Sequence, residues 1–320
     1  MIDDQHPPPL RLFVAAFAAV YFIWGSTYLA ILFAIETIPT FLMIGVRFAF
    51  GGVIMIALSN WGRDTDGRRP SASQWRDATI SGVLLMGCGT GTVAWAEHRI
   101  PSSVAALMVA TLPIWMVLFE AAHTRHWTSG ARVIGGIVVG FAGVSFIIRP
   151  AGGFTAGSPI DTTGAVAVLI AAMLWALGSI YSRHASLPRR PALTAGMQTL
   201  CGGGILIVFG LILGEGGQLD LGAISTRSAI SLAYLIVFGN IAFLAFSWLL
   251  KASTPARVST YAYVNPVIAV ILGWALAGEV LSSVQIAAAL MIVASVAMII
   301  SFNRPKPIRN TNHESGKEGR

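Results

Sequence analysis

The chain has 320 residues, of which 55% are hydrophobic and only 11% are charged, and its mean hydropathy is +0.72. Soluble domains carry about 25% charged residues, so this composition excludes a soluble globular protein and indicates that lipid is the main solvent. The net charge of +7 does not indicate nucleic-acid binding, because the basic residues lie in short loops beside apolar segments and form no basic face on a folded domain.

Ten apolar segments follow one another, each near the ~20 residues that cross a bilayer core as a helix. Backbone groups in lipid must be satisfied within the segment, and these runs are continuously apolar, so we expect an all-α membrane protein and not a barrel. The segments span 12–35, 40–60, 76–97, 101–122, 131–149, 162–183, 191–213, 228–250, 256–278 and 282–302. The tail 1–11 lacks the pattern of a removable signal, and the polar tail 303–320 is expected to be disordered.

The ten segments form two sets of five, 12–149 and 162–302, joined by a linker at 150–161. At an offset of 153 positions, Gly25-Ser26-Thr27-Tyr28 falls on Gly178-Ser179-Ile180-Tyr181, and Trp95 falls on Trp248. Because five is odd, the second set starts on the opposite face of the membrane. The pattern therefore predicts two inverted five-helix repeats around a central cavity.

Loop charges predict the orientation of the chain. With both termini in the cytoplasm, seventeen Lys and Arg residues lie on the cytoplasmic side and three lie on the outer side, namely Arg99, Arg149 and Arg227. Arg47 lies inside a segment and completes the basic residues. Since basic loops stay in the cytoplasm, we expect cytoplasmic N- and C-termini.

Several motifs resemble those of a known family. They are Trp24-Gly25-Ser26-Thr27-Tyr28, Arg47-Phe48, Ala110-Thr111-Leu112-Pro113, Tyr261-Ala262-Tyr263-Val264-Asn265-Pro266-Val267, and Gly278-Glu279 with Gln285. Together they resemble the EamA domains of the drug/metabolite transporter (DMT) superfamily. Ala96-Glu97-His98 with Pro101-Ser102 is most similar to the YedA-like branch of the bacterial inner (plasma) membrane. The resemblance covers about 12–302 and implies a ten-helix transporter with two inverted EamA repeats, mostly found as exporters of metabolites, amino acids or toxic compounds.

The sequence departs from the family pattern in two places. The Gly-Glu turn after the ninth segment is present as Gly278-Glu279, but the equivalent position after the fourth segment is His126. The first segment has no acidic residue, so the proton-coupling mechanism of the four-helix multidrug relatives cannot be carried over.

Ionisable residues inside or at the ends of segments are functional candidates, because burying them is costly. Arg47 could hold an anionic group of a solute, or it could bind carbonyls or a Glu and lock two helices together. Glu97 and Glu120 could couple transport to protons, although a solvated helix end explains each of them more simply. Glu120 and His123 share a helix face but are too few for a structural metal site, and no metal or cofactor is expected.

Aromatic and polar side chains in mid-helix positions predict a solute site. Pairs four residues apart share a helix face, and any one of these residues could instead be a packing residue. The candidates for substrate binding are Trp24, Ser26, Tyr28, Arg47, Trp95, Trp175, Ser179, Trp248, Tyr261 and Asn265. Together they indicate a mostly aromatic cavity that suits a neutral or zwitterionic amphipathic solute.

The sequence thus predicts an inner-membrane secondary transporter that exports a small organic solute by alternating access, with the lipid bilayer as surroundings and a proton as the candidate coupling ion. No phosphate-binding Gly-rich motif is present, which argues against ATP hydrolysis. The alternatives are a membrane-embedded enzyme or a non-transporting, receptor-like membrane protein. The first is opposed by the lack of an acid cluster and of a His-Glu-x-x-His motif, and the second by the repeat and the resemblance.

Overall fold

The computed structural model describes residues 9–61, 69–124, 131–148, 160–253, 258, 261–279 and 281–302, and every regular element in these residues is a helix. The first half contains five spans. Their elements are α1 (Leu10–Ala18), η1 (Ala19–Ile23) and α2 (Trp24–Ala34) in span 1, α3 (Thr40–Trp61) in span 2, α4 (Ala72–Gly82), η2 (Val83–Gly91) and α5 (Thr92–Ala96) in span 3, α6 (Ser102–Val109) and α7 (Leu112–Thr124) in span 4, and α8 (Ala131–Ile148) in span 5.

The second half repeats this order. Its elements are α9 (Thr162–His184) in span 6, α10 (Pro191–Ile212) in span 7, the short α11 (Glu215–Gln218) and η3 (Leu221–Ala223), α12 (Thr226–Ala252) in span 8, α14 (Tyr261–Ala277) in span 9 and α15 (Ser283–Phe302) in span 10. Seven of the described helical spans are long and apolar enough to cross a membrane, and three shorter apolar helices belong to spans 5, 9 and 10. The predicted all-helical membrane fold is confirmed, with helix ends within a few residues of the predicted segments.

Local sequence explains where several helices begin and end. Ser71 and Gln74 form a capping box at the start of α4, and the Asp161 carboxylate accepts a hydrogen bond from the Gly164 N–H at the start of α9. Gly214 (φ 83°) and Gly278 (φ 67°) adopt left-handed backbone conformations just after α10 and α14. Glycine reaches this region without strain, so both helices can stop abruptly.

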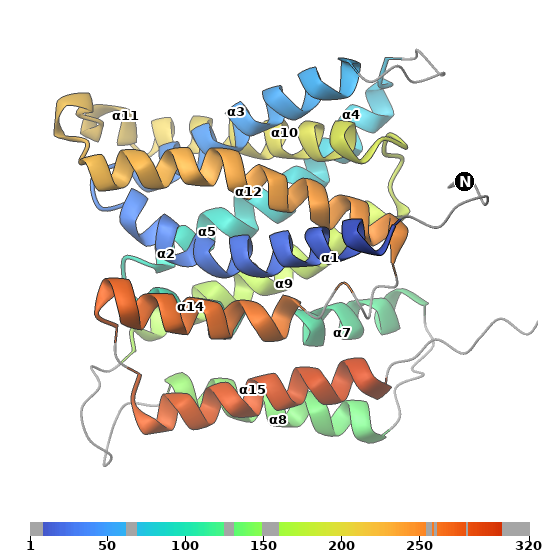
Figure 1. Cartoon of the computed structure of the whole chain (residues 1–320), viewed down its shortest axis with the longest axis vertical. Coiled ribbons are helices and arrows are strands. Elements are labelled where there is room, and N and C mark those ends of the chain that lie inside the picture. Colours follow the sequence, from blue (N-terminus) through green and yellow to red (C-terminus); the bar gives the residue numbers. More distant parts are fainter. Residues whose placement is uncertain are drawn as a thin grey trace, which may run out of the picture.

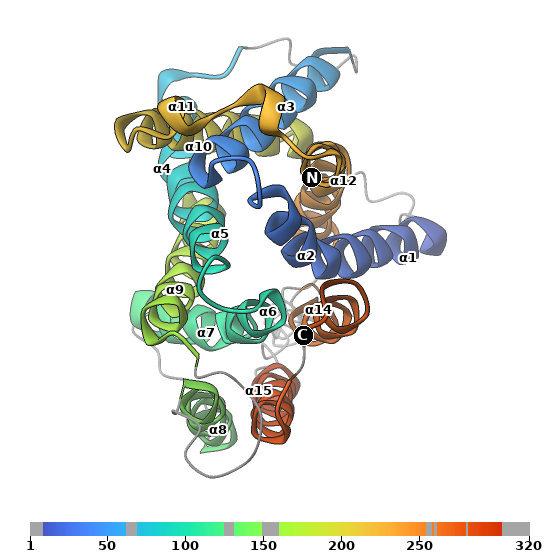
Figure 2. The same ribbon diagram turned by 90° about the vertical axis from the view of Figure 1, so that its left-hand side faces the viewer.

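The spans surround a central region in the end-on view of Figure 2, with α3 and α10 paired at one end of the molecule and α8 and α15 paired at the other. Figure 1 shows the same pairs at the top and bottom of the stack of helices. In the first pair, Gly52 of α3 meets the backbone of Leu200, and Gly196 of α10 lies 3.0 Å from the Gly52 carbonyl oxygen, measured from the position of an added Cβ. Only glycine allows backbones to pack so closely.

The main contacts between spans are preserved when the halves are exchanged. Span 3 packs against span 6, and span 8 packs against span 1. Likewise span 4 packs against span 6, and span 9 against span 1, while span 2 pairs with its counterpart span 7 and span 5 with span 10. Outward-facing apolar side chains such as Ile212, Trp274 and Leu290 are exposed, as expected of surfaces that contact lipid.

Three spans of the first half are irregular. Spans 1 and 3 contain π-helical stretches, η1 and η2, and span 4 is broken between Val109 and Leu112. Span 1 bends at η1, so that α1 leaves the bundle at an angle to α2 in Figure 2. π-helical turns within α-helices are frequently found at functional sites. In a membrane, irregular backbone is tolerated where it lines a cavity or is buried in protein.

Candidate solute-binding site

A cavity with an empty volume of about 750 Å³ lies between the two halves. Its walls come from spans 1 to 4 of the first half and from spans 6, 8 and 9 of the second. The lining residues are Trp24, Thr27, Tyr28, Ile31, Arg47, Phe48, Met86, Gly89, Thr90, Val93, Val109, Leu112, Ala171, Ala172, Trp175, Gly239, Phe243, Tyr261 and Asn265.

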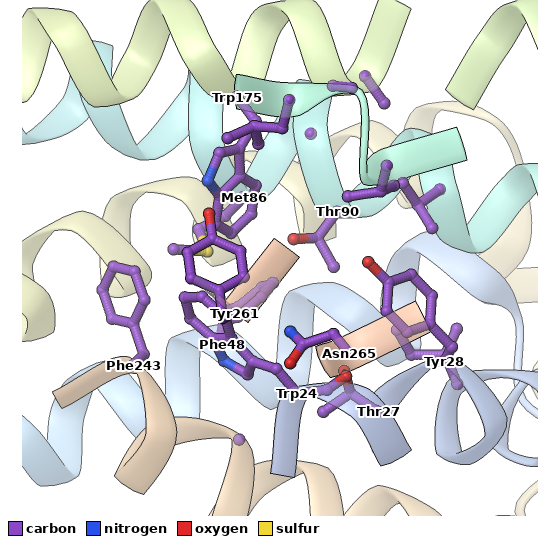
Figure 3. Close-up of a pocket in the computed structure, with 18 of the residues that line it drawn as sticks. Trp24, Thr27, Tyr28, Phe48, Met86, Thr90, Trp175, Phe243, Tyr261 and Asn265 are labelled. Atoms are coloured by element: carbon purple, nitrogen blue, oxygen red, sulfur yellow. The ribbon is translucent and has the colours of Figure 1, made fainter. Parts of the chain in front are cut away.

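Figure 3 shows two chemically different regions in this cavity. Trp175, Tyr261, Phe48 and Trp24 gather in one part of the view, with Phe243 beyond them. The polar groups of Tyr28, Thr90, Thr27 and Asn265 lie in the other part. The site can therefore offer aromatic contact and hydrogen bonds to the same ligand.

Trp24 holds the aromatic region together. Its ring lies edge-on to the rings of Tyr261, at 5.2 Å and 87°, and of Trp175, at 6.2 Å and 88°. Such T-shaped pairs are favoured by the ring quadrupoles. Gly89 of η2 makes room for this cluster, because an added Cβ would lie 2.8 Å from Trp175 Cε3. The aromatic wall therefore depends on the absence of a side chain at position 89.

Arg47 is the charged group in the cavity wall. Only 5% of it is exposed, and its guanidinium lies 4.5 Å above the Phe48 ring and 3.3 Å from the position of an added Cβ on Gly239. The Nε and Nη1 atoms have no hydrogen-bond partner among the described residues. A buried guanidinium with free donors is costly unless a ligand supplies acceptors. Nε and Nη1 therefore make no helix-locking bond in the described residues, although the guanidinium interacts electrostatically with Glu97.

Asn265 has a more structural role than the sequence suggests. With its amide nitrogen oriented toward the nearby carbonyls, the side chain donates to Tyr261 O at 3.2 Å and to Tyr21 O at 3.1 Å. Tyr21 belongs to η1, where the π-helical turn changes the backbone pairing. Asn265 therefore lines the cavity and also joins α14 of the second half to span 1 of the first.

Glu97 is buried, which overturns the interpretation of a solvated helix end. Only 4% of the residue is exposed, and neither carboxylate oxygen has a hydrogen-bond partner among the described residues. It interacts electrostatically with Arg47, Tyr28 and Glu279. Glu97 thus interacts both with residues of the cavity wall and with Glu279, which follows α14.

Four candidates do not line the cavity. Ser26 Oγ bonds to Ile23 O at 2.8 Å and to Tyr234 OH at 2.6 Å, and Ser179 Oγ donates to Trp175 O at 2.8 Å. The Arg99 guanidinium covers the Trp95 ring at 4.7 Å, and Trp248 packs on Phe13 at 5.1 Å. The side chains of Glu120 and His123, and residue His126, lie outside the described part of the chain.

The cavity also contains residues that the sequence did not single out. Thr27 and Phe48 could have been found, because they follow the predicted Trp24 by three positions and the predicted Arg47 by one. Met86 and Thr90 face the cavity from the π-helical η2, where a regular 3.6-residue period no longer predicts the exposed face. In the described residues, no three His, Cys, Asp or Glu side chains come together as potential metal ligands.

The fold and the cavity define a polytopic membrane protein with a solute-sized internal site. Residues 11–149 and 162–301 each match the EamA-like transporter family, and the chain belongs to this family. It is 37% identical over 300 residues to the inner membrane transporter YedA of Escherichia coli K12, covering 91% of this chain and 90% of that protein. It is therefore a multi-pass transporter of the inner membrane in the DMT superfamily.

More distant relatives share nearly the full length. The transporter YvbV of Bacillus subtilis is 22% identical, covering 92% of this chain and 93% of its own. The protein PecM of Dickeya dadantii is also 22% identical, covering 91% and 95%. A solved crystal structure aligns with a TM-score of 0.62 at 20% identity, covering 92% of this chain and 99% of that chain, and so shares the fold.

Proposed function

We propose that this transporter exports a small organic solute that combines an anionic group with an aromatic or apolar body, as an amino acid does. The observation that carries the proposal is the buried guanidinium of Arg47, which has free donors beside an aromatic wall. Arg binds a carboxylate with two parallel hydrogen bonds, and Trp24, Trp175 and Tyr261 offer ring faces and edges for an apolar body. Tyr28 and Asn265 would add hydrogen bonds near the polar groups of the solute.

The proposed route is alternating access by two inverted repeats, 12–149 and 162–302, joined by the linker 150–161. The exchangeable packing of the spans supports this, since a cavity between two similar halves can open to either side by a rocking motion. Ser26, Trp95, Ser179 and Trp248 are left out of the proposed site because of their bonds and packing elsewhere. An enzymatic role has no support in the described residues.

The test is solute binding and transport by purified protein in proteoliposomes. A panel would contain aromatic and aliphatic amino acids, together with the matching amides in which the carboxylate is lost. We expect the amides to bind about 10- to 100-fold more weakly, because a charge-assisted hydrogen bond contributes about 1.5–3 kcal/mol. Arg47→Gln should remove the preference for the acid, whereas Arg99→Gln, outside the cavity, should retain it. Equal binding of acid and amide by the unmodified protein would contradict the proposed solute class.

Proton coupling is proposed for Glu97, with Glu120 as the second candidate. Glu97→Gln and Glu120→Gln would be compared in proteoliposomes with and without a pH gradient, using solute binding as the control for an intact site. We expect Glu97→Gln to keep solute binding but to lose transport driven by the gradient. If both variants keep full gradient dependence, these carboxylates do not carry the coupling proton.

A further inference from the structure

Two carboxylates of the second half bind helix N-termini of the first half. Glu279, just after α14, accepts hydrogen bonds from Ser102 N and Ser102 Oγ, both at 2.8 Å, and from Ser103 N at 3.0 Å. Glu215, just after α10, accepts from Phe41 N at 3.1 Å and from Leu42 N at 2.8 Å. Each carboxylate thereby pairs with the unsatisfied N–H groups and positive end of a helix dipole.

The two contacts differ in what surrounds them. Glu279 interacts electrostatically with the buried Glu97, which has no hydrogen-bond partner among the described residues. Arg47 of α3 also acts on Glu97, and Glu97 in turn acts on Tyr28 of α2; both residues lie in the cavity wall. Glu215 acts on His98. Glu97 is therefore the group that connects the cavity to one of the two contacts.

We infer that Glu97 is a proton-binding site that controls the contact of Glu279 with the start of α6. With a proton on Glu97, Glu279 faces a neutral group and holds α14 against α6. Without the proton, the buried Glu97 carboxylate and the partly buried Glu279 carboxylate both carry a negative charge, and like charges repel. Loss of the proton then weakens the contact and opens this end of the bundle between the halves.

Ser103 provides a direct probe for this opening. It is fully buried at the contact, and its Oγ has no hydrogen-bond partner among the described residues, so replacement by Cys removes no bond. The backbone N–H that binds Glu279 is kept. The inference rests on the alternating-access part of the proposed function, but the measurement needs no solute. A failure would therefore leave the solute class untouched.

The experiment measures labelling of Ser103→Cys in full-length protein in proteoliposomes, with Cys88→Ala and Cys201→Ala as background. A membrane-impermeant maleimide is added between pH 5 and pH 9. Gly217→Cys, an exposed position where an added side chain meets nothing, gives the intrinsic pH dependence of labelling. After this correction, we expect labelling at position 103 to rise about tenfold with pH.

Variants of the carboxylates decide the outcome. Glu97→Gln should hold labelling low at every pH, and Glu279→Gln should hold it high at every pH. Glu215→Gln, the matched control, should keep the pH response. Ser102→Ala, which removes only one of the three bonds, should raise the labelling and still respond to pH. A pH response that survives in Glu97→Gln, or no response in the unmodified chain, would overturn the inference.

Discussion

The two halves share one order of helices but differ in regularity. In the first half, spans 1 and 3 contain the π-helical η1 and η2, and span 4 is broken between α6 and α7. In the second half, α9, α10 and α12 run without interruption for 23, 22 and 27 residues. The irregular half supplies Arg47, Tyr28 and Glu97, whereas the regular half supplies the carboxylates that bind helix N-termini. The second half also supplies Trp175, Tyr261 and Asn265 to the cavity wall, so the halves differ in the ionisable groups that they contribute.

The largest expected effect concerns the orientation of the halves. If they are inverted, a reporter active only in the cytoplasm should work after Arg190 and after Arg320, and should fail within 150–160. The physical reason is the strong excess of Lys and Arg on one side of the predicted spans. The measurement is reporter activity in cells, normalised to expression. A cytoplasmic signal from the linker would contradict the inverted arrangement, since the halves would then have the same orientation.

Two glycines at equivalent positions of the repeat should behave differently. An added Cβ on Gly51 would overlap the Asn240 amide, whereas one on Gly204 would meet nothing within 4 Å. Gly51→Ala should therefore lower stability by about 1–3 kcal/mol through overpacking. Gly204→Ala should be neutral or stabilising by up to ~1 kcal/mol, because alanine favours helix. Melting temperatures in detergent check this. An equal loss of stability in the two variants would show that the two glycines are packed alike.

The smallest expected effect distinguishes Tyr28, which is proposed only to bind solute, from Asn265, which also connects two helices. Tyr28→Phe removes one hydroxyl from the cavity and should weaken solute binding by about 0.5–1.5 kcal/mol without changing the melting temperature. Asn265→Ala should lower both the solute affinity and the melting temperature, because the Asn265 amide also bonds to the carbonyls of Tyr261 and Tyr21. Solute affinity and melting temperature would be measured on the same preparations. An unchanged melting point for Asn265→Ala would assign this residue to solute binding alone.

The positions of the spans could be predicted from the sequence because the bilayer imposes a simple requirement on each crossing. Each crossing needs about 20 apolar residues, and charged or Pro- and Gly-containing stretches mark the turns. The predicted segment 162–183 corresponds to α9 at Thr162–His184, and 191–213 to α10 at Pro191–Ile212. The irregular backbone could not be predicted, since a π-helical turn depends on tertiary partners such as Asn265.

The sequence predicted part of the cavity for a related reason. Pairs four residues apart placed Trp24 with Tyr28, and Tyr261 with Asn265, on faces that do line it. Ser179 satisfies the same spacing but donates to the carbonyl four residues earlier, as serine often does within helices. The burial of Glu97 was also beyond the sequence, because its position at a helix end gives no information on the neighbours that cover it.

The bond between Asn265 and the Tyr21 carbonyl has a mechanical consequence. Tyr21 lies near the middle of span 1, which runs from Leu10 to Ala34. A link at mid-depth acts as a fulcrum, with one lever arm of each half above it and one below. In the proposed alternating access, separation of the arms at one membrane surface would require their approach at the other, so the two entrances of the cavity would not open together.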